Sequence, residues 1–202
     1  MAVSTQQVIK RYETYVMNTY VRKPLVITKG KGSRVWDVEG HEYLDLFPGW
    51  GVSGLGYNHP WVMTALRGQT SRIIHISNTY YHPNQAKAAK QLVEAAFDGK
   101  VFFTNSGAEA VETAVKLAHK WGNETGGRHE IIAMECSFHG RTMAALSATG
   151  QKKYQEGFEP LVPGFVHVPY DDLEAVKRAI TPKTCAILVE PIQGEGDRKS
   201  VV

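Results

Sequence analysis

The chain has 202 residues, of which 43% are hydrophobic and 21% are charged, and its formal net charge at pH 7 is +3. This composition is typical of a globular protein and excludes the collagen-like, low-complexity and intrinsically disordered classes. Basic residues are interspersed with acidic ones, so we expect no nucleic-acid partner. The longest strongly apolar runs, such as residues 186–189, are far too short to span a bilayer, and we expect no membrane association.

The cysteines and the N-terminus bear on the compartment. Two cysteines cannot stabilise a chain of this length as a disulfide scaffold, which favours a reducing environment. The N-terminal residues MAVSTQQ show no basic segment followed by an apolar one, so we expect no secretory signal. These features predict a cytoplasmic protein.

The first part of the chain predicts a helix and a hairpin. Apolar residues recur at helical spacing from Val8, which predicts a helix over residues 4–19 with Ser4 as its N-cap. Residues 34–46 predict a hairpin with its turn at Glu39-Gly40. Two further helices are expected over residues 59–67 and 84–97.

From residue 100 onward, strands and helices alternate. The expected strands cover residues 100–104, 130–134, 164–168 and 185–189, and the expected helices cover residues 108–121, 141–148 and 171–180. In the first of these helices, one apolar face is expected from Val111, Ala114, Val115 and Ala118. This alternation predicts an α/β protein with a parallel sheet covered on both faces.

Residues 49–54 match the pattern G-x-G-x-x-G. A dinucleotide site needs a helix that begins at these glycines, because its N-terminus must meet the pyrophosphate. Gly56, Asn58 and Pro60 follow instead. We therefore expect sharp turns or a close approach of the backbone to a ligand, and no dinucleotide site.

Cys136 and His139 form a C-x-x-H pair without a second pair at ligand spacing, and the 8 histidines are dispersed. A structural zinc site usually needs two such pairs. We therefore expect packing or loop roles for these residues and no metal.

The strongest local motif is Asn105-Ser106-Gly107-Ala108-Glu109, where an expected strand gives way to a long helix. Unpaired N–H groups at such a helix start can hold phosphate, and small residues leave room for its oxygens. The alternative is that Ser106 only caps the helix. The turn alone leaves both interpretations open.

A second motif, Ser137-Phe-His-Gly-Arg-Thr142, follows the strand that ends at Met134. Ligands of α/β proteins bind at this end of the strands. Phe138 could stack on a flat ring, and Arg141 could hold a carboxylate. Taken alone, the motif is better explained by a core phenylalanine and a solvated helix arginine.

The third motif, Glu190-Pro-Ile-Gln-Gly-Glu-Gly196, also follows an expected strand. Its two acids and its glutamine would form a polar rim around a pocket. Taken alone, it would be an ordinary loop.

Together, the three motifs and their flanks resemble class-III (ornithine-type) aminotransferases, which use pyridoxal phosphate. The blocks that carry this resemblance are FFTNSGAEAVETAVKLA, SFHGRTMAALSATGQKKYQEGFEPLVPGF and AILVEPIQGEG. The similarity covers roughly residues 15–196, and the second block is most similar to the acetylornithine branch.

The resemblance implies a type-I pyridoxal-phosphate transferase fold, which we expect here in truncated form. Residues 1–58 would be the N-terminal segment of the small domain with a Gly-rich active-site loop. Residues 59–196 would be the N-terminal part of the large cofactor-binding domain, whose sheet is mostly parallel. Residues 197–202 are an unmatched tail.

The resemblance also implies cofactor-binding roles. Gly107 and Ala108, in the turn with Ser106, would bind the cofactor phosphate through backbone N–H groups. Phe138 would stack on the pyridine ring. Glu190 would lie beside that ring.

Four further residues are implied as substrate-binding. Arg141 would pair with the substrate carboxylate. Glu195 would be the gating acid that pairs with a second arginine until 2-oxoglutarate needs that arginine. Tyr20 and Trp50 would line the substrate entrance.

The implied reaction is amino transfer from N-acetylornithine, or a similar ω-amino acid derivative, to 2-oxoglutarate in arginine biosynthesis, by a homodimer. The lysine that binds the cofactor covalently in this family has no counterpart here, so we expect no catalytic residue in this chain and interpret it as a fragment. The sequence does not separate acetylornithine, succinylornithine and succinyl-diaminopimelate as donors. The alternatives are a non-catalytic half of a split aminotransferase and a module that binds a phosphorylated ligand.

Overall fold

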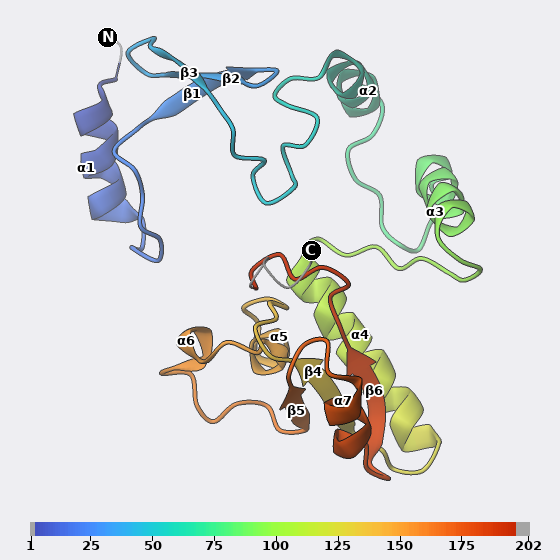
Figure 1. The fold of residues 1–202 in the computed structure, drawn as a ribbon. Coiled ribbons are helices and arrows are strands. Elements are labelled where there is room, and N and C mark those ends of the chain that lie inside the picture. The colour runs from blue at the N-terminus through green and yellow to red at the C-terminus, as the bar shows by residue number, and fades with distance from the viewer. Residues whose placement is uncertain (1–2, 197–202) are drawn as a thin grey trace. The chain divides into compact units, whose positions relative to one another are not determined.

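The structure is a computed structural model that describes residues 3–196 (Figure 1). The chain divides into two compact units, one up to Lys87 and one from Ala88. The expected tail, residues 197–202, lies outside the described residues, and the expected domain boundary after residue 58 stays a prediction. None of the helices within residues 3–196 has the length and apolar character needed to cross a membrane.

The first unit begins with helix α1 (Thr5–Tyr15). Ser4 is its N-cap: the Ser4 Oγ accepts the Gln7 N–H, and the Gln7 side chain accepts the Ser4 N–H in return. The predicted helix continued to residue 19, which is wrong, because Val16 already has an extended backbone. No residue of α1 is buried, so packing does not extend the helix beyond its local signals.

Three antiparallel strands follow, in the order β1-β2-β3: β1 (Ile27–Lys31), β2 (Arg34–Asp37) and β3 (Glu42–Leu44). The hairpin of β2 and β3 confirms the prediction for residues 34–46, and Gly40 has a φ of +92° in its turn. The sequence did not identify β1 as a strand.

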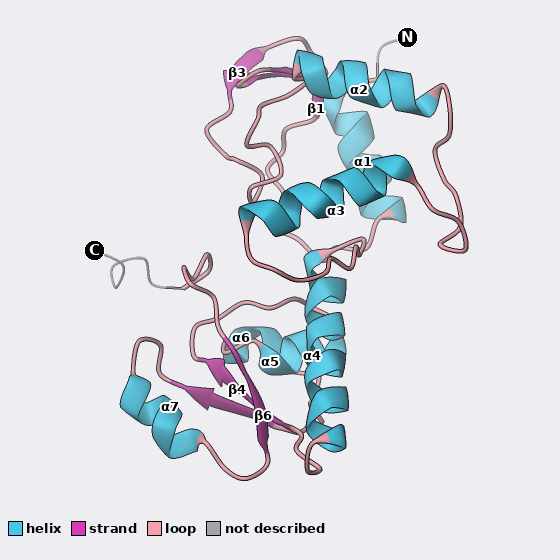
Figure 2. Cartoon of the chain, turned by 90° about the vertical axis from the view of Figure 1, so that its right-hand side faces the viewer, coloured by secondary structure: helices cyan, strands magenta, loops and turns pink. Residues whose placement is uncertain are grey.

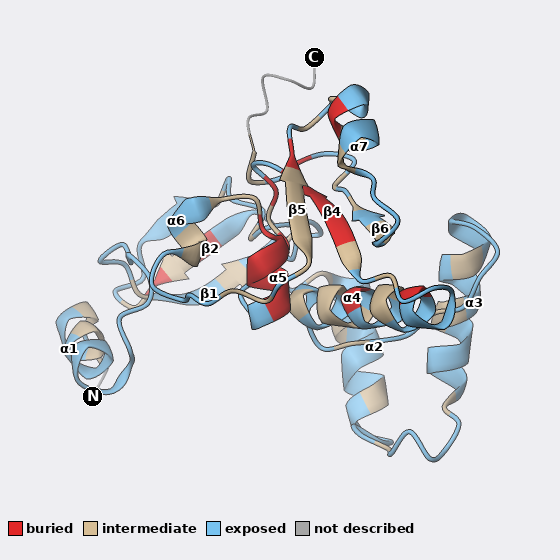
Figure 3. Ribbon diagram, turned by 90° about the horizontal axis from the view of Figure 1, so that it is seen from below, coloured by how far each residue is buried: buried red, intermediate tan, exposed pale blue. Residues whose placement is uncertain are grey.

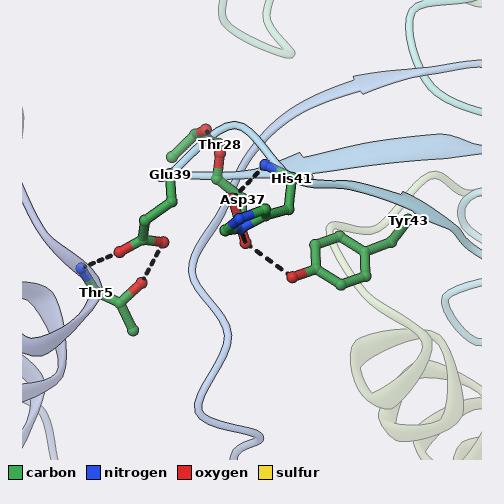
Figure 4. Close-up of polar contacts among 6 residues, drawn as sticks. All are labelled: Thr5, Thr28, Asp37, Glu39, His41 and Tyr43. Carbon is green, nitrogen blue, oxygen red and sulfur yellow. Dashed lines mark hydrogen bonds and ion pairs between the residues drawn. The ribbon is translucent and has the colours of Figure 1, made fainter.

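A buried carboxylate fixes this hairpin turn (Figure 4). Asp37 is 5% exposed, and its Oδ1 accepts the His41 N–H at 2.8 Å. Its Oδ2 accepts the Tyr43 hydroxyl at 2.8 Å and lies 2.9 Å from His41 Nδ1. Burial alone raises the pKa of Asp37, but the hydrogen bonds from Tyr43 and His41 outweigh burial and lower the pKa to about 2.

The same turn holds the start of α1. The Glu39 carboxylate accepts the Thr5 N–H at 3.0 Å and the Thr5 hydroxyl at 2.7 Å (Figure 4). These bonds lower the pKa of Glu39. The helix and the hairpin are therefore joined by polar contacts.

The rest of this unit contains turns and helix α2 (Pro60–Thr70), and helix α3 (Pro83–Ala95) spans the division between the units after Lys87; neither helix has a buried residue. Residues 49–55 form successive turns, and no helix begins at the G-x-G-x-x-G glycines. This agrees with the expectation that the pattern is not a dinucleotide-binding motif.

The second unit is built on a parallel sheet with the order β5-β4-β6. Figure 2 shows β4 and β6 of this sheet in magenta. Its strands are β4 (Glu130–Met134), β5 (Phe165–Val168) and β6 (Thr184–Leu188). Ile132 pairs with Val166 on one side and with Ile187 on the other. The helices are α4 (Gly107–Glu124), α5 (Met143–Ala148), α6 (Lys152–Gln155) and α7 (Leu173–Ala179).

The sheet is covered on both faces, as predicted, and the core follows the alternation of β4 (Figure 3). Ile132 clusters with Val168 and with Ala175 of α7. Ile131 clusters on the opposite face with Val115 of α4 and Ala144 of α5. Each buried isoleucine contributes roughly 1.5–3 kcal/mol, so β4 anchors the whole unit.

Two local expectations are wrong. Residues 100–104 form no strand, because no strand within residues 3–196 lies beside them to complete a hydrogen-bond ladder. Ala114, expected on the apolar face of α4, is exposed. The buried face of this helix instead includes Val115 and Gly122.

The Asp37 contacts predict an acid-sensitive first unit. The folded-state pKa is below the ordinary value of 3.8, so the stabilisation is present above about pH 4 and is lost as the pH falls toward 2. Asp37→Asn should destabilise the unit at pH 7 and flatten this dependence in urea unfolding between pH 7 and 2.5. Asp98→Asn, which changes an exposed loop carboxylate, is the control. An unchanged pH dependence in the Asp37 variant would contradict this account.

Gly122 predicts a packing limit between α4 and β6. A Cβ at this position would overlap the Arg128 carbonyl oxygen and lie 2.7 Å from the Cys185 Cβ. We expect Gly122→Ala to lower the free energy of unfolding by about 1–3 kcal/mol. Gly68→Ala in α2, where a Cβ meets nothing within 4 Å, should instead be neutral or stabilising by up to about 1 kcal/mol. Equal urea midpoints for Gly122→Ala and the unsubstituted chain would refute the packing argument.

Candidate active site

The three motifs of the second unit lie at related positions of the fold. Strands β4, β5 and β6 are parallel, so their carboxyl ends share one edge of the sheet. The loops that follow β4 and β6 begin at this edge and carry two of the motifs. Such an edge is where open α/β sheets bind ligands.

The remaining motif forms the start of α4. Ser106 is the N-cap, and its Oγ accepts the Glu109 N–H at 3.2 Å. The Glu109 carboxylate accepts the Asn105 N–H at 2.6 Å. Within residues 3–196, the N–H groups of Gly107 and Ala108 have no acceptor. Ser106 is thus a helix cap, and the two following N–H groups are left for a ligand.

The space beside this turn can accommodate an anion. A Cβ built on Gly107 would meet nothing within 4 Å. Unpaired N–H groups and the helix dipole both favour a negative group at the start of an 18-residue helix. The turn therefore fits a phosphate bound through the backbone, which needs no lysine.

Hydrogen bonds hold the segment after β4 rigidly. Ser137 is fully buried, and its Oγ donates to the Met134 carbonyl at 2.6 Å and accepts the Gly150 N–H at 3.0 Å. The His139 N–H donates to the Thr149 hydroxyl at 2.9 Å. This segment consequently presents its remaining side chains from a fixed backbone.

Phe138 and Arg141 of this segment lie together. The Phe138 ring is partly buried and packs edge-to-face on Tyr154, with ring centroids 5.5 Å apart. The exposed Arg141 has its guanidinium carbon 5.6 Å from the centroid of the Phe138 ring. An aromatic ring and a cation thus lie side by side.

Two contacts bring the three motifs together. The Phe138 N–H donates to Glu190 Oε2 at 3.0 Å, across 52 residues of sequence. Gly140 has a φ of +134°, and a Cβ built on it would lie 2.9 Å from the Ala108 Cβ. The loop after β4 therefore touches both the loop after β6 and the first turn of α4.

The loop after β6 is docked in place. Gln193 is 4% exposed and donates to the Glu135 carbonyl at 2.8 Å. The Tyr170 hydroxyl donates to the Pro191 carbonyl at 2.9 Å. Glu195 follows as a partly buried residue of the same loop, and its gating role stays a prediction.

Tyr20 and Trp50, expected at the substrate entrance, belong to the first unit and are 55% and 76% exposed. Trp50 has a φ of +58° and packs edge-to-face on Phe47. Their place in the site stays a prediction.

His139 is a buried residue of the loop after β4. It is 7% exposed, and burial lowers its pKa, with the nearby His167 lowering it further. Its Nε2 has no hydrogen-bond partner among the residues that the structure describes. Cys136, by contrast, is exposed. Burial therefore disfavours the charged form of this imidazole.

Sequence reasoning missed two residues that shape the site. Tyr154 packs on Phe138, and Glu112 accepts hydrogen bonds from the start of α5. Neither residue belongs to a local motif, and the sequence around Glu112 is typical of an ordinary helix acid. Glu112 follows Ala108 by four residues, so the two lie on the same face of the helix. This spacing was the one signal in the sequence that could have identified Glu112.

Comparisons with known proteins identify the family. The family described as aminotransferase class-III matches residues 15–199. An acetylornithine aminotransferase from Methanothermobacter thermautotrophicus is 48% identical over 194 residues, which are 96% of this chain and 49% of that protein. A succinylornithine transaminase/acetylornithine aminotransferase from Pseudomonas aeruginosa is 46% identical, over 92% of this chain and 46% of that protein.

Solved structures support the same assignment. An ornithine aminotransferase from Toxoplasma gondii, with partial occupancy of PLP at its active site, has a TM-score of 0.89 and 33% sequence identity. The similarity covers 96% of this chain and 46% of that chain, and it confirms the predicted fold class. This chain spans about half the length of the curated relatives it matches. The chain belongs to the class-III aminotransferase family.

Proposed function

We propose that this chain supplies part of the active site of a pyridoxal-phosphate-dependent aminotransferase: the surface that binds the cofactor and the substrate carboxylate. The observation that supports this most directly is the contact of three separate segments, through Phe138 with Glu190 and through Gly140 with Ala108. Bound pyridoxal phosphate would supply an electron sink for the bond changes at the amino-bearing carbon.

The residues present fit the cofactor. The unpaired N–H groups of Gly107 and Ala108 would hold its phosphate, with the Ser106 hydroxyl as a further donor. Phe138 would stack on its ring. Glu190 would act through Phe138, because one of its carboxylate oxygens already accepts the Phe138 N–H.

Arg141 would bind the substrate carboxylate. Its guanidinium is exposed beside the Phe138 ring, where a bidentate pair can form. Glu195 as gating acid, and Tyr20 and Trp50 at the entrance, complete the proposed substrate contacts.

The proposed reaction is amino transfer from N-acetylornithine, or a similar ω-amino acid derivative, to 2-oxoglutarate, in arginine biosynthesis in the cytoplasm. The names of the relatives support this donor class, and one relative carries both the acetylornithine and the succinylornithine name. We also propose that the active assembly is a homodimer.

Binding of pyridoxine 5′-phosphate to the 202-residue chain tests the phosphate site. This cofactor analogue has no aldehyde, so it cannot modify surface lysines. Phosphorus NMR titration should show binding that Gly107→Asp weakens by at least about tenfold, because a second negative group occupies the same N–H groups. The same substitution should leave the thermal midpoint equal or higher, since an acid in the first helical turn stabilises the helix.

Gly107→Asn is the matched control, because its side chain has nearly the same size and no charge. We expect its dissociation constant to rise less than that of Gly107→Asp, because Asn adds the bulk of the aspartate without its charge. Equal affinities for the Asp and Asn variants, or no binding by the unsubstituted chain, would contradict a phosphate site at α4.

A further inference from the structure

Glu112 of α4 caps the start of α5, because the N-cap residue Thr142 makes no side-chain cap hydrogen bond of its own. Its Oε1 accepts the Thr142 hydroxyl at 2.5 Å, the Ala144 N–H at 3.1 Å and the Ala145 N–H at 3.3 Å. One carboxylate oxygen therefore binds three donors that lie 30 to 33 residues away. Hydrogen bonds to an ionised acceptor are roughly twice as strong as neutral ones.

The position of Glu112 on α4 relates it to the phosphate turn. Ala108 and Glu112 are four residues apart, so they lie on the same face of the helix, one turn from each other. Gly140 packs on Ala108, and Thr142 binds Glu112. The segment that contains Arg141 is thus attached to α4 at two successive turns.

The other end of this segment is also held by a carboxylate. The Phe138 N–H donates to Glu190 in the loop after β6. Phe138 and Arg141 therefore lie between two fixed points, Glu190 on one side and Glu112 on the other. The backbone of Arg141 is therefore held relative to the N–H groups of Gly107 and Ala108.

We propose that Glu112 is a positioning residue that sets the spacing between the phosphate-binding turn and the carboxylate-binding Arg141. This inference rests on the proposed function. The rigid first two turns of α4 carry both the phosphate N–H groups and the carboxylate that holds Thr142 next to Arg141. Glu112 itself touches neither cofactor nor substrate.

The test compares Glu112→Ala and Glu112→Gln in the 202-residue chain. The first readout needs no ligand: the NMR signals of the Arg141 side chain should carry an upfield shift, because its guanidinium lies near the Phe138 ring. Glu112→Ala should remove this shift, whereas Glu112→Gln should retain it, since the amide oxygen can still accept from Thr142, Ala144 and Ala145. A role limited to stability would leave the signature unchanged in every folded variant.

The second readout is the affinity for two probes. Glu112→Ala should raise the dissociation constant for 2-oxoglutarate about tenfold, the equivalent of one charge-assisted hydrogen bond. The dissociation constant for pyridoxine 5′-phosphate should change by less than about threefold, because the N–H groups of Gly107 and Ala108 remain. Glu124→Gln at the other end of α4, where the carboxylate is 65% exposed beside Lys120, is the control and should change neither constant.

Thr142→Ala takes the place of Glu112→Ala in this test if Glu112→Ala does not fold. It removes only the hydroxyl donor to Glu112, and it should weaken 2-oxoglutarate binding and reduce the Arg141 shift in the same direction. An unchanged Arg141 shift in folded Glu112→Ala, or in Thr142→Ala where the former does not fold, would overturn the inference. Failure of the unsubstituted chain to bind 2-oxoglutarate would instead overturn the proposed function, and the ligand-free shift would still decide the role of Glu112.

Discussion

The hydrogen bond from the Phe138 N–H to the Glu190 carboxylate joins two loops that are 52 residues apart in sequence. It is one of several polar contacts that replace apolar packing at this edge of the sheet. The fully buried Ser137 and Thr149 and the nearly buried Gln193 serve the same purpose, because each binds backbone groups that would otherwise lose their hydrogen bonds on burial. The geometry of the proposed site depends on these polar contacts.

The apolar core positions this edge without reaching it. Ile131 and Ile132 bury opposite faces of β4 against α4 and α7. Beyond Met134, the chain changes from alternating apolar residues to a polar loop. Core packing therefore fixes where the strands end, and hydrogen bonding fixes the conformation of the loops beyond them. The groups proposed to bind ligands lie at the boundary between the apolar core and the hydrogen-bonded loops. There, backbone N–H groups and side chains can remain accessible to a ligand.

Local patterns in the sequence predicted the elements whose cause is local. The bounds of β4, the hairpin around Gly40 and the Ser106 cap of α4 follow from residue alternation, turn chemistry and capping. The expected strand at residues 100–104 failed because a strand exists only with a partner, which no local pattern supplies. Glu112 was missed for the same reason: its hydrogen-bond donors are 30 to 33 residues away, and only the folded structure brings them to it.

The proposed binding roles differ between the two units. The second unit would bind phosphate and carboxylate, and the first unit would supply residues at the substrate entrance. Phosphate and carboxylate are common to every proposed substrate and cofactor pair, and the groups proposed to bind them are held by the hydrogen bonds of the second unit. Tyr20 and Trp50, proposed to line the substrate entrance, are exposed residues of the first unit. A rigid frame suits groups that must not move during the reaction, because small misplacements are costly. Exposed aromatic residues suit discrimination among donors, since loop surfaces vary without disturbing the core. Close relatives with different donor names are the expected consequence of such a division.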